Sequence, residues 1–303
     1  MSRHLGPRVT GRLRRGRPRT GLAALAALAA SGAVMAVPGA AAAGTTAAPL
    51  SPTAYVTNSG TDTVTPINTA TNTPGTPIKV GPGPDAIAAT PNGATVYVAN
   101  GGTDTVTPIN TATNTPGTPV NVGSFPDGIA ITPNGATVYV ASGDSTSNAV
   151  TPISTATNTP GTPIKAGLGA TDIAITPNGA TAYVTNQYKH TVTPVNLATS
   201  TAGTPISKIG ATDIAITPDG ATAYVTNGSE VIPISTATNT RGAPITAGSI
   251  TCGIAITPDG ATAYVTDFGP TPGTVIPINL ATNTAGAPIT VGSEPDAIAI
   301  VSR

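Results

Sequence analysis

The chain has 303 residues, of which 9% are charged, 3% are aromatic, 35 are Gly and 31 are Pro. Its 13 basic and 13 acidic residues cancel, but seven arginines lie within the first 19 positions and no acidic residue precedes Asp62. The rest of the chain therefore carries six basic and 13 acidic residues. This argues against a nucleic-acid partner, which would require a basic surface.

The first 43 residues have the three parts of a signal peptide. An arginine-rich start precedes an apolar stretch at 21–37 and the small-residue cleavage pattern Ala41-x-Ala43. We predict a signal peptide at 1–43, a linker at 44–52 and one domain at 53–303. The apolar stretch is short and rich in Ala, which disfavours a membrane span. An uncleaved anchor and, from Arg14-Arg15, twin-arginine export are the alternatives. The mature protein is expected to be secreted or at the cell surface, without a transmembrane span.

From residue 53 onward the sequence is an internal repeat. The motif A-Y-V or its equivalent recurs at spacings of 42, 42, 44, 41 and 40 residues, with its tyrosine at Tyr55, Tyr97, Tyr139, Tyr183, Tyr224 and Tyr264. One full unit, 84–123, predicts four short strands at 86–90, 95–100, 105–110 and 118–122. Thr90-Pro91-Asn92-Gly93 predicts a turn with a left-handed Gly, and Pro-Gly pairs such as Pro74-Gly75 predict a type II turn before the fourth strand.

Proline also recurs inside the predicted third strand, at Pro66, Pro108, Pro152, Pro194, Pro233 and Pro277. An interior strand needs a backbone N–H at every second residue to pair with each neighbour, and proline has none. We therefore expect a local break or bulge in this strand.

Four-stranded units of this kind bury their faces by stacking radially, which predicts an all-β propeller. Residues 53–58 are a strand of the second type, and 296–300 are a strand of the first type, so the two chain ends complement each other. We predict six four-stranded blades closed by these N- and C-terminal strands. A seven-blade-like arrangement or an open ring is the alternative.

The repeat resembles the YVTN-repeat β-propellers over nearly all of residues 53–300. The name motif occurs literally at 55–58, 183–186 and 224–227, and segments such as IAITPNG and TVTPINTATN resemble the flanking strands of that family. The resemblance implies a bacterial propeller that is exported or associated with the cell surface. Many relatives have seven blades, so six repeats are a departure, and the family offers no general catalytic motif.

Residues for catalysis are scarce after the predicted leader. That part of the chain holds one histidine, His190, and one cysteine, Cys252, so a three-histidine metal site and an intrachain disulfide are excluded. It contains no G-x-S-x-G motif. We therefore predict a protein that is not an enzyme and has no cofactor.

A recurring acidic position is the one candidate for a cofactor site. The carboxylates precede or begin the innermost strand, at Asp85, Asp127, Asp172, Asp213 and Asp296. In a propeller they would gather near one mouth of the central channel, where several carboxylates suit Ca²⁺. The alternative is that these side chains accept hydrogen bonds from nearby backbone N–H groups in turns.

The loops between the second and third strands break the repeat, and a site that selects one ligand needs such differences. The loops at 142–148 and 267–273 are longer than the others, and 187–190 has a distinct composition. We predict a binding surface on the face these loops form, with candidate contacts at Gln187, Tyr188, Lys189, His190, Asp144 and Phe268.

The preferred prediction is a non-enzymatic, exported binding or cell-envelope module whose partner is an unidentified protein or envelope component. A hydrolase or lyase with a cation at the channel mouth, and a structural component of a surface layer, are the alternatives.

Overall fold

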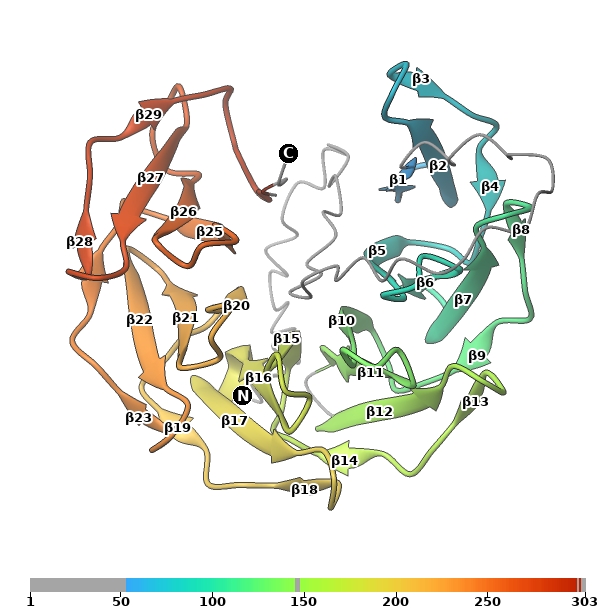
Figure 1. Cartoon of the computed structure of the whole chain (residues 1–303), viewed down its shortest axis with the longest axis horizontal. Helices are drawn as coiled ribbons and strands as arrows, with labels where there is room; N and C mark the ends of the chain where they lie inside the picture. The colour runs from blue at the N-terminus through green and yellow to red at the C-terminus, as the bar shows by residue number, and fades with distance from the viewer. Residues whose placement is uncertain (1–52, 145–147, 299, 301–303) are drawn as a thin grey trace, which may run out of the picture.

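The computed structural model describes residues 53–144, 148–298 and 300, and the predicted signal peptide and linker lie outside that range. The described chain is all-β, with one short 3-10 helix, η1 (Gln187–Lys189). Its strands form six antiparallel sheets that follow one another around an arc (Figure 1). Each sheet corresponds to one repeat, and we number the sheets 1 to 6 in chain order.

The strand bounds repeat closely from sheet to sheet. Sheet 1 contains β1 (Thr53–Asn58), β2 (Thr63–Asn68), β3 (Thr73–Pro74) and β4 (Ile78–Lys79). Sheet 2 contains β5 (Pro84–Ala89), β6 (Thr95–Asn100), β7 (Thr105–Asn110), β8 (Thr115–Pro116) and β9 (Val120–Asn121). Sheet 3 contains β10 (Pro126–Ile131), β11 (Thr137–Ser142), β12 (Ala149–Ser154), β13 (Thr159–Pro160) and β14 (Ile164–Lys165).

The remaining three sheets keep this pattern. Sheet 4 contains β15 (Ala170–Ile175), β16 (Thr181–Asn186), β17 (Thr191–Asn196), β18 (Thr201–Ala202) and β19 (Ile206–Ser207). Sheet 5 contains β20 (Ile214–Ile216), β21 (Thr222–Asn227), β22 (Glu230–Ser235), β23 (Thr240–Arg241) and β24 (Ile245–Thr246). Sheet 6 contains β25 (Thr251–Ile256), β26 (Thr262–Asp267), β27 (Thr274–Asn279), β28 (Thr284–Ala285) and β29 (Ile289–Thr290). The second and third strands of the repeat are confirmed to the residue.

The expected break in the proline-bearing third strand is wrong, because the interruption lies in the fourth strand instead. β2 pairs with β1 without a register shift and places Pro66 opposite Tyr55. The Pro66 carbonyl points away from β1 and accepts a hydrogen bond from the Gly75 N–H at 2.7 Å, in the gap between β3 and β4. Since N and O of one strand residue point to the same side, the missing donor of Pro66 faces this gap and breaks no bond to β1.

One predicted turn is confirmed and the other is wrong. Gly93 has φ +68°, and its N–H bonds to the Thr90 carbonyl, as expected for the Thr-Pro-Asn-Gly turn. Before the split fourth strand, however, the left-handed residue is Asn72, at φ 53°, and not Gly75. The Asn68 side chain accepts hydrogen bonds from the next backbone N–H groups and so closes this turn.

Apolar side chains fill the space between neighbouring sheets, in five clusters for six sheets. Between sheets 4 and 5, for example, Tyr183 packs with Ile206 and with Ile234 of the next sheet. The tyrosine hydroxyl then reaches the left-handed asparagine of the following sheet, from Tyr55 to Asn114, Tyr97 to Asn158, Tyr183 to Asn239 and Tyr224 to Asn283, at 2.6–2.9 Å. The repeated Tyr is thus a connector between sheets.

The predicted closure through the chain termini is not formed in this structure. β1 pairs with β2 alone, and residues 291–298 contain no strand. Sheet 1 therefore lacks the inner strand that the other five sheets have, and the arc in Figure 1 is open between sheets 6 and 1. A C-terminal strand would be stabilised only by hydrogen bonds to the edge of β1. In this structure residues 291–298 do not lie along that edge, so the strand does not form.

A polar ladder at the ends of the second and third strands yields a stability prediction. The Asn100 amide donates to the hydroxyls of Thr105 and Thr107, at 3.1 and 2.9 Å. In sheet 3 the shorter Ser142 replaces this Asn, and the buried hydroxyls of Ser142 and Thr151 have no hydrogen-bond partner within the described residues.

Replacing Ser142 by Asn should restore the donor to Thr151 and raise the free energy of unfolding by about 0.5–1.5 kcal/mol. Urea unfolding followed by circular dichroism measures the change. Asn100→Ser is the matched reverse substitution and should lower stability by a similar amount; a destabilised Ser142→Asn would contradict the assignment.

Candidate binding face

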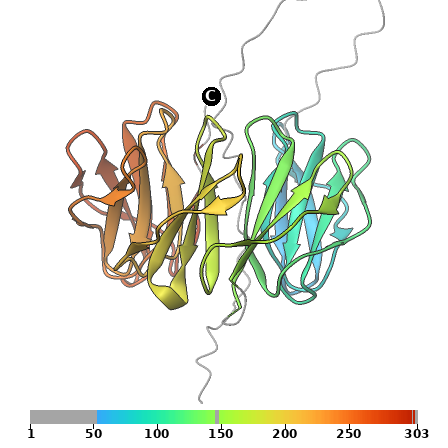
Figure 2. The same cartoon turned by 90° about the horizontal axis from the view of Figure 1, so that it is seen from below.

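Connections of two kinds emerge on one face of the arc, as the repeat predicts. The loops between the second and third strands and the connections from one sheet to the next both lie at the ends of the strands that carry the inner-strand aspartates. In Figure 2 the strands run between this face, which holds η1, and the opposite face of Thr-Pro-Asn/Asp-Gly turns. We call it the loop face.

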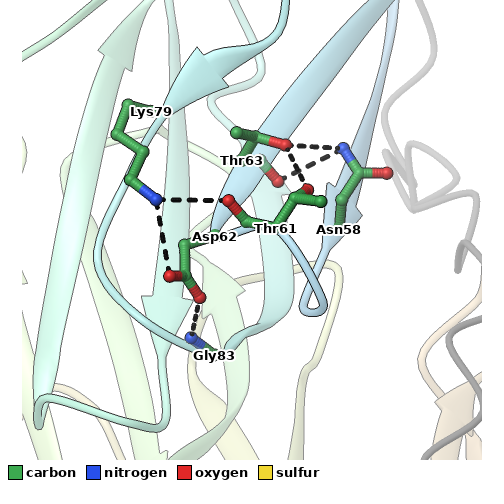
Figure 3. Close-up of polar contacts among 6 residues, drawn as sticks. All are labelled: Asn58, Thr61, Asp62, Thr63, Lys79 and Gly83. Carbon is green, nitrogen blue, oxygen red and sulfur yellow. Dashed lines mark hydrogen bonds and ion pairs between the residues drawn. The ribbon is translucent and has the colours of Figure 1, made fainter.

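Two aspartates build the framework of the loop face. Asp62 has φ 54°, its carboxylate accepts the Gly83 N–H at 3.1 Å, and its other oxygen lies 3.4 Å from the Lys79 ammonium (Figure 3). In sheet 2 the Asp104 carboxylate likewise accepts a backbone N–H from the next connection, that of Phe125, at 3.0 Å. Each carboxylate ties its loop to the connection that enters the next sheet.

His190 occupies the corresponding position in sheet 4. It keeps the left-handed backbone, at φ 52°, and its carbonyl accepts the Ile209 N–H, as the Asp62 carbonyl accepts that of Val80. Its imidazole makes no hydrogen bond within the described residues. The change from Asp to His therefore removes a structural bond and leaves a side chain available at the surface.

The η1 turn before His190 presents Tyr188, whose side chain is 57% exposed. Its ring lies over Gly169, where even an added Cβ would clash with it. A glycine in the connection between sheets 3 and 4 thus makes room for the ring. Gln187 and Lys189 are exposed in the same turn.

Phe125 is a residue of the loop face that the sequence analysis missed. It is 51% exposed and has φ 52°, a conformation that is unfavourable for a bulky residue. The equivalent positions in two neighbouring connections are Gly83 and Gly169, at φ 63° and 70°. An alignment of the connections with one another could have found it, because an aromatic residue stands where glycine is the fitting choice.

Phe268 and Ile250 form the third apolar region, on sheet 6. The Phe268 N–H donates to the Ile250 carbonyl at 2.9 Å, and Ile250 is 49% exposed. Burial would raise the pKa of Asp267, but backbone N–H groups of Ile250, Ser249 and Gly269 bond to its carboxylate and lower the pKa. Asp267 therefore holds this loop as a structural carboxylate, and Phe268 is half-buried beside it.

Asp144 lies at the start of the third variable loop and is half-buried. Residues 145–147 of that loop are outside the described range. The neighbouring Gly143 donates its N–H to the Phe125 carbonyl at 2.7 Å, so the loop borders Phe125. All candidate residues predicted on the variable loops lie on this one face, on sheets 3, 4 and 6.

The five inner aspartates do not act alike. Asp172 accepts the Ile214 N–H at 3.1 Å, and Asp213 accepts the Ile254 N–H at 2.9 Å, so each side chain bonds to the next sheet. Asp127 borders Gly143, and Asp85 is exposed. Asp296 lies near enough to Asp213 for its charge to raise the pKa of that group.

The pKa values of the Asp172 and Asp213 carboxyl groups are both raised, and each group influences the other. Burial, followed by the charge of Asp213, raises the pKa of Asp172 well above its ordinary value. Burial also raises the pKa of Asp213, and the hydrogen bond from Asp172 opposes this. Two buried carboxyl groups that lie this close together disfavour ionisation of both at once.

No metal-binding cluster is found at these aspartates within the described residues. Within residues 53–144 and 148–298, no group of three or more His, Cys, Asp or Glu side chains could hold a metal ion. Two open grooves lie at the outer strands instead, one lined by 118–121 and 157–160, the other by Tyr224, Arg241 and Asn283 among others. No helix of the described chain is long and apolar enough to cross a membrane.

Comparison with known proteins finds similarity in structure and none in sequence families. No family of sequences and no curated protein matches the chain. Its structure is similar to that of Kuenenia stuttgartiensis hydrazine synthase, with a TM-score of 0.74 and 22% identity over 82% of this chain and 86% of that one. The fold is β-propeller-like. A functionally unknown protein from Desulfotomaculum acetoxidans DSM 771 is also similar, with a TM-score of 0.71 and 21% identity over 80% and 81% of the two chains. Identities this low establish the fold of the propeller-like arc alone; membership of the YVTN-repeat family stays a prediction.

Proposed function

We propose that the protein is a non-enzymatic, exported binding module that contacts a protein or cell-envelope partner through the loop face. The observation that carries the proposal is the gathering of exposed apolar side chains there. Phe125, Tyr188 and Ile250 are three of the four large hydrophobic residues that are exposed in the described chain. Exposed aromatic residues are frequent anchors of interfaces.

The backbone at Phe125 strengthens this proposal. Glycine holds the same position in two other connections and Glu294 holds it in a third, so Phe125 is the aromatic residue of this left-handed set. An exposed aromatic residue in a left-handed conformation suggests a contribution to function. The arc supplies a rigid scaffold from which such loops can be presented.

The sequence supports export and the absence of catalysis. The signal-peptide pattern at 1–43 favours secretion or a surface location, and the scarcity of His and Cys disfavours catalysis. A bound Ca²⁺ at the inner aspartates has little support, because Asp172 and Asp213 already accept backbone N–H groups.

Substituting the apolar residues of the loop face tests the proposal. Partner capture from envelope extract with the mature protein is followed by affinity measurement on the isolated partner. Phe125→Gly should weaken binding at least tenfold. It should leave the melting temperature unchanged or raised, because glycine suits positive φ. The triple variant Tyr188→Ala, Lys189→Ala and Phe268→Ala should also lose binding while keeping the wild-type circular dichroism spectrum.

Asp219→Asn, on the opposite face, is the matched control and should bind as the wild type does. Its position is filled by Asn92, Asn134 and Asn178 in other repeats, so the fold should be retained. Wild-type affinity in both Phe125→Gly and the triple variant would exclude the loop face as the binding surface.

A further inference from the structure

Five asparagines of the chain precede a glycine, which is the pair most open to deamidation because glycine has no Cβ to shield the side-chain amide. The glycine nitrogen attacks the asparagine Cγ, a C–N bond forms, and the amide nitrogen leaves as ammonia. Water then opens the cyclic imide to aspartate or isoaspartate. Since the five pairs share one dipeptide sequence, differences in their reactivity come from the folded structure. The five are Asn92, Asn100, Asn134, Asn178 and Asn227.

Three of these asparagines lie in the Thr-Pro-Asn-Gly turns, which hold both reacting groups. In sheet 2 the attacking nitrogen is that of Gly93, whose N–H donates to the Thr90 carbonyl at 2.8 Å. The Asn92 Oδ1 accepts the Ala94 N–H at 3.0 Å and the Thr90 hydroxyl at 2.7 Å, which fixes the amide. Deamidation there requires the turn to open first. The same bonds recur in the turns at Asn134 and Asn178.

Asn100 is protected by burial. Its side chain is fully buried, and its Nδ2 donates to the hydroxyls of Thr105 and Thr107. The N–H of Gly101 donates to the Gly83 carbonyl at 2.9 Å. The leaving group and the attacking nitrogen are therefore both hydrogen-bonded.

At Asn227 the attacking nitrogen is unprotected. Asn227 ends β21 and pairs with Glu230 across the two-residue loop 228–229. Gly228 has φ +65°, as in the first loop position of a type II′ turn. Its N–H donates no hydrogen bond to any described residue, and a Cβ built on it would have no atom within 4 Å. Nothing in the described chain therefore withholds this nitrogen from the Asn227 side chain.

The leaving group of Asn227 is also unheld, because sheet 5 lacks the polar ladder. In sheets 1, 2 and 4 the equivalent amide donates to two threonine hydroxyls of the third strand. Sheet 5 has Glu230 and Ile232 at these positions, and the Asn227 Nδ2 donates to no residue of the described chain. The Oδ1, by contrast, accepts the Gly210 N–H at 2.6 Å. Negative charge develops on this oxygen as the nitrogen attacks, and the N–H stabilises it.

We infer that Asn227 is a modification site, at which the protein converts its own amide into a carboxylate while the other four pairs persist. Each conversion consumes one water and releases one ammonia. The product fits the fold, since Asp267 holds the equivalent position in sheet 6 and accepts the N–H groups of Ser249 and Ile250. The loop face, where Asn227 lies, gains one negative charge. This chemistry requires no partner and is independent of the proposed binding.

Mass spectrometry of the mature protein, digested after incubation in mildly alkaline buffer, tests the inference. In the folded protein, Asn227 should deamidate at least about tenfold faster than each of the other four asparagines, because it lacks the hydrogen bonds that hold them. In urea the five should react at similar rates, because the dipeptide is the same in all of them.

Glu230→Thr restores one hydroxyl of the ladder and should slow the deamidation of Asn227 about three- to tenfold. Glu230→Ala removes the same carboxylate without adding a hydroxyl; it is the matched control and should react as the wild type does. Circular dichroism should show that both variants keep the fold. Equal rates at all five pairs in the folded protein, faster reaction at one of the other four, or equal rates in the two Glu230 variants would overturn the inference.

Discussion

Replacing Tyr183 by Ala is expected to lower the free energy of unfolding by about 3–5 kcal/mol, the largest effect we predict. The ring is buried between sheets 4 and 5 among Ile206, Ile209 and Ile234. The hydroxyl donates to the Asn239 side chain at 2.6 Å and reaches the Thr236 carbonyl at 3.2 Å. Ala leaves a cavity and removes the polar link between the two sheets. Urea unfolding measures the loss.

Two phenylalanine variants separate packing from hydrogen bonding. Tyr183→Phe keeps the ring and should cost about 1 kcal/mol. Tyr139→Phe should cost close to nothing, because Ser200 stands where the other sheets have Asn, and within the described residues Tyr139 makes no bond of this kind. An equal cost for the two phenylalanine variants would refute the role of the Tyr–Asn link.

Asp172→Asn is expected to stabilise the protein at pH 7. Burial and the neighbouring Asp213 raise the pKa of Asp172, so the folded state binds the proton more tightly than the unfolded chain. Stability from this group is therefore fully present at low pH, and it falls as the pH rises from the unfolded value, about 3.9, through the folded pKa. An Asn amide can donate to Asp213 and accept from Ile214 without needing a proton.

The pH dependence is the sharper measurement. Thermal unfolding between pH 3 and pH 8 should show the gain of Asp172→Asn growing with pH, since ionisation of Asp172 favours the unfolded wild-type chain and the Asn side chain does not ionise. Asp219→Asn is the control: hydrogen bonds from Thr217 and Ala221 lower the pKa of Asp219, and other repeats carry Asn at this position. A lower melting temperature of Asp172→Asn at pH 7 would contradict the raised pKa of Asp172.

Part of the candidate binding face follows from the repeat, since the topology of four strands decides which loops share a face. Tyr188 and Phe268 could be identified from the sequence, because the equivalent loops of the other repeats lack an aromatic residue. Phe125 was missed because only the loops within each sheet were compared, and the connections between sheets were not aligned with one another. The inner aspartates were predicted as one set, but the structure divides them, because inter-sheet geometry decides which carboxyl meets a backbone N–H.

The sequence alone determined the second and third strands of each repeat, the strand order and the stacking of six units, because these depend on local turn chemistry and on the alternation of apolar residues along each strand. The bounds of the first strand and the division of the fourth were decided by the folded structure. Tertiary structure decided where the proline gap falls, because a missing N–H matters only on the side toward which it would point. It also decided that the ends of the arc stay apart in this structure. Closure depends on the angle between neighbouring sheets, which arises from the packing of five interfaces together and is encoded in no single repeat.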